Sequence, residues 1–95
     1  VNFSIYFYEC NKGTKRCGSY QLHAGFEVKG VTAGKLGDWN RTKRFGRAYL
    51  DTDGLPHVEM DVDAARGFST EALANQYDRW RVVMREFGAF IGWKK

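Results

Sequence analysis

The chain contains few of the residue types on which metal and cofactor sites depend. Its 95 residues include only two cysteines, two histidines and one proline. The cysteines, Cys10 and Cys17, match no zinc pattern, which requires four ligands drawn from close Cys or His pairs. No apolar run approaches the roughly 20 residues of a membrane-spanning helix. We therefore expect no metal, no cofactor and no membrane span.

A strong excess of one charge is also lacking. Fifteen Lys and Arg residues are interspersed with 11 Asp and Glu residues, which gives a net charge of +4. This mixture argues against the concentrated basic face of a nucleic-acid-binding protein. Apolar residues make up 43% of the chain, enough for one packed core, so we expect a single domain over residues 1–95. Because the chain begins with Val1 and not Met, we expect a processed or trimmed form.

Two segments near the start alternate apolar and polar residues, as half-buried strands do. They are residues 1–10, VNFSIYFYEC, and residues 17–26, CGSYQLHAGF, joined by a polar turn that contains glycine. A hairpin that pairs Cys10 with Cys17 also aligns the two apolar faces, whereas a shift by one residue would separate them. The apolar pairs of this register are Phe7 with Tyr20, Ile5 with Leu22, Phe3 with Ala24, and Val1 with Phe26.

This register predicts a cross-strand disulfide between Cys10 and Cys17, on the face of the hairpin opposite the core. A disulfide implies an oxidising compartment, so we expect a periplasmic or secreted protein. The alternative is a cytoplasmic protein with two free thiols.

A first helix is predicted within residues 30–44. Thr32 can cap its N-terminus, and Leu36, Trp39 and Lys43 lie on one side at three- and four-residue spacing.

A longer helix is predicted over residues 68–93. Ser69 is the expected N-cap, and Phe68 is expected to pack on Leu73. The helix carries an apolar stripe that suits packing on a sheet or on another helix. The stripe consists of Leu73, Tyr77, Trp80, Met84, Phe87 and Ile91.

Between the helices, residues 45–51 and 55–63 are predicted to form a second hairpin around the turn 52–54. The face of the first strand that joins the core stays open. A two-residue loop aligns Phe45 and Tyr49 with the apolar face of the partner strand, and a three-residue loop with Gly54 left-handed aligns Ala48 and Leu50. The predicted fold is therefore α+β in the order ββαββα, an antiparallel sheet of about four strands with two helices.

No set of catalytic residues is indicated. His23 falls on the polar face of its strand and His57 lies near a turn, so both are expected to be solvated and not catalytic. His57 and Glu59 have the spacing of the zinc deaminase pattern, but no cysteine follows Cys17 to complete it.

The acidic residues of the second hairpin favour structure over calcium binding. A calcium loop that began at Asp51 would place Pro56 where glycine is required. The sequence Asp51–Gly54 is instead typical of a turn. The acidic row Glu59, Asp61 and Asp63 is expected to be a solvated strand face, with a weak divalent-cation site as the minor alternative.

Residues 39–47 combine cations and aromatics, as single-strand nucleic-acid binders do. The candidate partner-binding residues here are Trp39, Asn40, Lys43, Arg44 and Arg47. The favoured interpretation is that the aromatic residues face the core and that the cations are solvated or paired with the acidic neighbouring strand.

The linear pattern resembles the YbjN-like family, bacterial proteins labelled as sensory transduction regulators. The residues that carry the resemblance lie between the first predicted helix and the last, and residues 19–30 also resemble the family's middle strand, so the resemblance covers nearly the whole chain. The matching residues from the first helix to the last are Trp39, Asn40, Arg44, Phe45, Arg47, Ala48, Tyr49, Leu50, Asp51, Asp53, Gly54, Glu59, Asp61, Gly67 and Trp80.

The resemblance implies a fold similar to type III secretion chaperones and no enzymatic activity. The family's usual N-terminal helix and strand are expected to be missing before Val1, which would leave the first strand as an exposed edge. We therefore expect a regulatory or chaperone-like module that binds a protein or an extended peptide, or forms a homodimer, at that edge. The alternative function is a nucleic-acid-binding regulator that uses residues 39–47.

Overall fold

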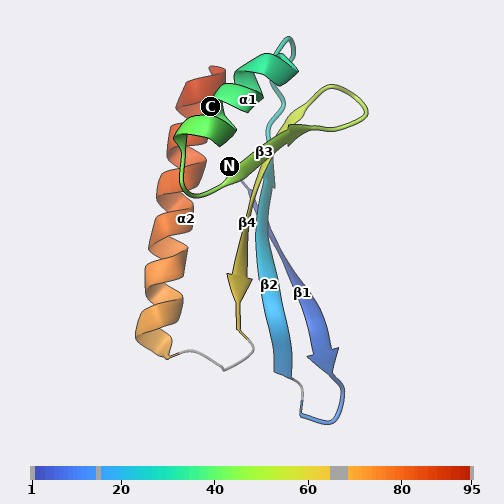
Figure 1. Ribbon diagram of the computed structural model, residues 1–95, viewed down its shortest axis with the longest axis vertical. Helices are drawn as coiled ribbons and strands as arrows, with labels where there is room; N and C mark the ends of the chain where they lie inside the picture. The colour runs from blue at the N-terminus through green and yellow to red at the C-terminus, as the bar shows by residue number, and fades with distance from the viewer. Residues whose placement is uncertain (1, 15, 65–68, 95) are drawn as a thin grey trace.

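A computed structural model describes residues 2–14, 16–64 and 69–94 of the chain (Figure 1). The order ββαββα is confirmed, and the four strands form one antiparallel sheet in the order β1-β2-β4-β3. The elements are β1 (Ser4–Asn11), β2 (Arg16–Gly25), α1 (Ala33–Thr42), β3 (Arg47–Leu50), β4 (Pro56–Asp63) and α2 (Thr70–Ile91). In the parts of the chain that the structure describes, no helix is both long and apolar enough to cross a membrane.

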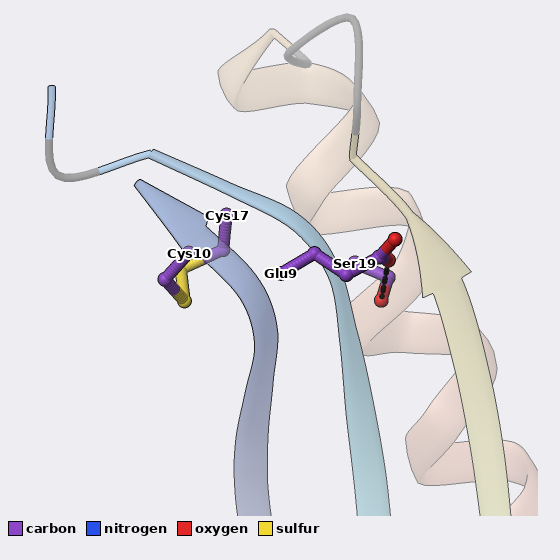
Figure 2. The surroundings of a disulfide bond; sticks show 4 residues. All are labelled: Glu9, Cys10, Cys17 and Ser19. Atoms are coloured by element: carbon purple, nitrogen blue, oxygen red, sulfur yellow. Dashed lines mark hydrogen bonds between the residues drawn. A yellow bond between two sulfur atoms is a disulfide. The ribbon is translucent and has the colours of Figure 1, made fainter. Parts of the chain in front are cut away.

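The first hairpin has the predicted register. Ile5 lies opposite Leu22, Phe7 opposite Tyr20, and Cys10 opposite Cys17. The two cysteines form a disulfide (Figure 2). The ladder begins at Ser4, so the predicted pair of Phe3 with Ala24 lies just before it. The predicted pair of Val1 with Phe26 involves a residue outside the described ranges.

Both predicted helix caps are present. The Thr32 Oγ1 accepts a hydrogen bond from the Lys35 backbone N–H at 3.1 Å, and the Ser69 Oγ accepts one from the Ala72 N–H at 3.0 Å. These bonds satisfy amides that a helix N-terminus otherwise leaves unpaired. The predicted packing of Phe68 on Leu73 involves a residue outside the described ranges.

The second hairpin uses the alternative in which Gly54 is left-handed. Its φ is 79°, and Ala48 lies opposite Val58 on the buried face of the sheet. Tyr49 and Phe45 are consequently exposed. The Asp51 Oδ1 accepts hydrogen bonds from the N–H groups of Asp53 and Leu55, each at 2.9 Å, which is the structural use of an aspartate in a turn.

The core lies between the sheet and the two helices. The central strands β2 and β4 supply one apolar face, and both helices pack their tryptophans into it. The residues of the buried hydrophobic cluster are Tyr20, Leu22, Ala24, Phe26, Leu36, Trp39, Ala48, Val58, Met60, Trp80, Val83, Phe87 and Ile91. The edge strand β1 adds little, because its apolar residues Ile5 and Phe7 are 46% and 62% exposed.

The disulfide gives a direct test of the hairpin. Reduction should lower the free energy of unfolding by about 2 kcal/mol, because it restores the conformational freedom of a short loop in the unfolded chain. Urea unfolding with and without reductant measures this difference.

The control is the double variant Cys10→Ser with Cys17→Ser. It should match the reduced protein and no longer respond to reductant. Alkylation of the unreduced, unfolded protein should add no mass. Adducts on both cysteines, or equal stability in the two redox states, would contradict a stabilising bond.

Candidate functional site

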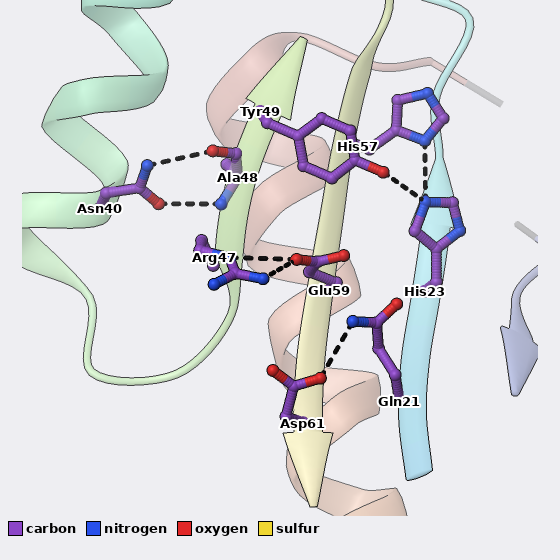
Figure 3. Close-up of polar contacts among 9 residues, drawn as sticks. All are labelled: Gln21, His23, Asn40, Arg47, Ala48, Tyr49, His57, Glu59 and Asp61. Atoms are coloured by element: carbon purple, nitrogen blue, oxygen red, sulfur yellow. Dashed lines mark hydrogen bonds and ion pairs between the residues drawn. The ribbon is translucent and has the colours of Figure 1, made fainter. Parts of the chain in front are cut away.

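Two of the five predicted partner-binding residues hold α1 against β3. Trp39 is 1% exposed, and its indole Nε1–H donates a hydrogen bond to the Gly46 carbonyl at 2.8 Å. Asn40 donates through Nδ2 to the Ala48 carbonyl at 3.0 Å and accepts through Oδ1 from the Ala48 N–H at 2.8 Å (Figure 3). The side-chain amide thus pairs with the backbone at the outer edge of β3, where the backbone of a further strand would otherwise bind.

The other three residues are cations in contact with neighbours on the surface. The Lys43 Nζ lies 5.3 Å from the centre of the Trp39 ring and 3.8 Å from a carboxylate oxygen of Glu86. The Arg44 guanidinium lies 5.4 Å from the ring centre of Phe45. Such cation–aromatic contacts are worth about 0.5–1 kcal/mol at exposed positions.

Arg47 pairs with the acidic strand, as the favoured interpretation held. Its Nε–H donates to the Glu59 Oε1 at 3.0 Å, and Nη2 contacts the same oxygen (Figure 3). The hydrogen bond and the charge of this carboxylate raise the pKa of Arg47. Glu59 is 9% exposed, so the arginine neutralises a carboxylate that would be costly to bury alone.

The structure brings four of the five predicted residues to one pocket of about 470 Å³. Asn40, Lys43, Arg44 and Arg47 line it together with two carboxylates, those of Glu59 and Asp61. The pocket therefore has mixed charge. That composition does not suit a polyanion, which is bound by cations with few acids beside them.

A polar network that the sequence did not predict lies on the face of the sheet opposite α2 (Figure 3). The Oδ2 of Asp51 lies 2.7 Å from the His57 Nε2, and the His57 Nδ1 lies 3.0 Å from the His23 Nε2. The same His23 nitrogen lies 3.1 Å from the hydroxyl of Tyr49. One chain of contacts thus joins residues from β2, β3, β4 and the turn between β3 and β4.

The surroundings shift the pKa values of this network in opposite directions. Burial, and then the neighbouring His57, lower the pKa of His23, while Glu59 opposes this effect. Burial raises the pKa of Tyr49, and the carboxylates of Glu59 and Asp51 add to it. The hydrogen bond from His57 lowers the pKa of Asp51.

The sequence could not reveal the network because 34 positions separate His23 from His57. Both were expected to be solvated, and only the pairing of β2 with β4 brings them together. The acidic row is also less solvated than expected, since Glu59 is buried and Asp61 accepts a hydrogen bond from Gln21 at 2.9 Å. Among the described residues, no group of three or more His, Cys, Asp and Glu side chains is arranged to hold a metal ion.

Comparison with known families identifies the chain. The family model YbjN, described as "Putative bacterial sensory transduction regulator", matches residues 1–93. The chain belongs to the YbjN family. No curated protein and no solved structure matches it, so the predicted similarity to type III secretion chaperones stays a prediction. The family description supports a regulatory role and names no enzymatic activity.

This YbjN domain also exposes an apolar surface beside its first strand. Ile5 and Phe7 of β1 and Leu73 and Tyr77 of α2 are each more than 40% exposed. Phe3 links the two elements, because its ring centre lies 6.0 Å from that of Tyr77. We call these five residues the β1–α2 surface. A groove of about 890 Å³ begins at Phe3 and Tyr77 and continues along α2.

The apolar stripe predicted for α2 is buried only in part. On α2, the residues Trp80, Phe87 and Ile91 are buried as predicted, whereas Leu73 and Tyr77 from the same stripe are exposed. Among the described residues, the exposed N-terminal part of the stripe approaches the start of β1 where the ring of Tyr77 contacts Phe3. Apolar residues that gather in this way are typical of a surface that contacts another chain.

The structural role of Asn40 gives a prediction. Asn40→Ala should lower the free energy of unfolding by about 1–2 kcal/mol, because two hydrogen bonds to the backbone of Ala48 are lost. Urea unfolding monitored by tryptophan fluorescence measures the change. Asn75→Ala, at an exposed position on α2, is the matched control and should stay within about 0.5 kcal/mol of the parent. Equal stability of the two variants would show that the contact to Ala48 contributes nothing.

Proposed function

We propose that this YbjN domain is a non-enzymatic bacterial regulator that binds an extended segment of another protein at β1. The β1–α2 surface is the observation that carries the proposal. It places exposed apolar side chains directly beside a strand that, among the described residues, pairs on one side only.

Strand addition fits both halves of this arrangement. An incoming segment can pair its backbone with the outer edge of β1, and its alternate side chains can then cover Ile5 and Phe7. Backbone pairing supplies affinity with little dependence on sequence, whereas the apolar surface selects apolar side chains at every second position. The expected ligand is therefore a strand-forming segment with alternating apolar residues.

The charges on β1 favour such a ligand over a nucleic acid. Glu9 is the one charged residue of the strand, and the cations of residues 39–47 lie beside carboxylates. A second copy of the chain is the alternative occupant of the edge, because β1 itself alternates apolar and polar residues. The disulfide supports a periplasmic or secreted location for this binding.

A pair of adjacent substitutions on β1 tests the proposal. Phe7→Asp places a charge on the β1–α2 surface, and Tyr8→Asp places the same charge on the opposite face of the same strand. Both positions are exposed, so both variants should keep the stability of the parent. Affinity for an added strand should fall at least 10-fold for Phe7→Asp and less than about threefold for Tyr8→Asp.

The binding measurement uses immobilised domain and separate periplasmic and cytoplasmic extracts, followed by quantitative mass spectrometry. A partner is counted only if the parent and Tyr8→Asp retain it and Phe7→Asp loses it. A photo-crosslinker at position 7 then identifies the segment in contact. Retention of the same proteins by both variants would overturn the proposal, and so would retention that falls steeply with salt, as nucleic-acid binding does.

Light scattering separates the two occupants of the edge. A dimer that the parent forms and Phe7→Asp does not would assign the surface to a second copy. A monomer at all concentrations would exclude a second copy, and the crosslinked segment would then identify the partner.

A further inference from the structure

The two histidines of the chain contact each other through one nitrogen of each ring. Their facing nitrogens, the His57 Nδ1 and the His23 Nε2, are 3.0 Å apart, while their ring centres are 4.9 Å apart. The nitrogens therefore lie between the two rings, and the ring planes differ by 30°. The 3.0 Å separation of the two nitrogens suits a hydrogen bond.

Asp51 determines where His57 carries its first proton. The Asp51 carboxylate can only accept, so the His57 Nε2 at 2.7 Å from it carries hydrogen. In the neutral ring the other nitrogen, Nδ1, is then an acceptor. It follows that the His23 Nε2 carries the hydrogen of the contact and donates it to His57, and that the Tyr49 hydroxyl, 3.1 Å from the same nitrogen, accepts a share of that hydrogen.

This arrangement accepts one additional proton and no more. A proton added to the His23 Nδ1 leaves the hydrogen bond between the rings intact and strengthens it with a charge. A second proton must go to the His57 Nδ1, where it would face the N–H of His23. Two cationic rings with opposed N–H groups repel each other, so the contact breaks.

The groups around the two histidines do not change the limit of one added proton. Tyr6 on β1 contacts His23 through its ring at 5.9 Å, and Tyr49 on β3 contacts both rings. Glu59 on β4 favours protonation of His23, but its charge is already shared with Arg47.

Gly25 provides the space that the contact needs. A Cβ atom at this position would lie 2.8 Å from the His57 Cε1 and 2.9 Å from its Nδ1, which is closer than real side chains approach. The imidazole of His57 therefore lies directly over the backbone of β2 at Gly25. A single methyl group there would displace the ring without changing any titratable residue.

We propose that the chain Asp51–His57–His23–Tyr49 is an acid-sensitive lock, which joins β2 to the β3–β4 turn while the two imidazoles share at most one added proton and opens when they take up a second. This function is independent of strand addition at β1. Tyr49 and Asp51 belong to β3 and the turn that follows it, whereas His23 belongs to the central strand β2.

A proton titration followed by NMR tests the lock directly, since the chain has only two histidines. Both imidazoles should follow two-step curves, because each senses the protonation of the other. The two steps should differ at least 10-fold in proton affinity. In Gly25→Ala, each histidine should titrate in one step. In Tyr6→Phe, the matched control on the same face, the two steps should remain.

Amide hydrogen exchange measures the opening. At pH values below the second protonation step, the amides of residues 51–57 should lose at least 10-fold in protection from exchange. This loss is measured after correction for the intrinsic pH dependence of exchange. In Gly25→Ala this loss should already be present at neutral pH. Single-step titration of both histidines in the parent, or protection that is unchanged across the second step, would overturn the proposal even if Gly25→Ala did not fold.

Discussion

The antiparallel pairing of β2 with β4 is the contact on which the rest of the structure depends. These strands are not consecutive, since α1 and β3 lie between them in the sequence. Their shared apolar face, with Leu22 opposite Met60 and Ala24 opposite Val58, is the surface that both helices cover. Their other face places His23 near His57. One register therefore determines both the core and the polar network.

The same pairing explains why the two edges of the sheet differ. The edge strand β3 is short and is covered at its outer side, because Asn40 of α1 forms hydrogen bonds with the backbone of Ala48. The other edge strand, β1, has eight residues and lies beyond the part of the sheet that α2 covers. A long uncovered edge with apolar side chains normally invites another strand. Among the residues that the structure describes, the domain thus protects the β3 edge itself and leaves the β1 edge unpaired.

Local patterns in the sequence were sufficient for the elements, the register of the first hairpin and the disulfide. Alternation identified β1 and β2, and the pair of cysteines selected one register because both criteria had to hold together. The turn at Gly54 left two alternatives, since the face of β3 depends on one residue of loop length. What the sequence could not provide was the contact of β2 with β4, which has no local signal. The burial of Glu59 and the meeting of the histidines depend on it.

Residues 39–47, which carry part of the resemblance to the family, are therefore the least suited to report on partner binding. Trp39 and Asn40 already use their polar groups inside the domain, and Arg47 compensates a buried carboxylate. A substitution at any of the three changes the stability of the fold before it changes the surface, so lost binding there would not locate a binding site. Exposed positions such as Phe7 do not have this ambiguity, because little of the side chain is buried in the isolated domain. The binding that we propose at β1 is accordingly separable from architecture, because the core ends there.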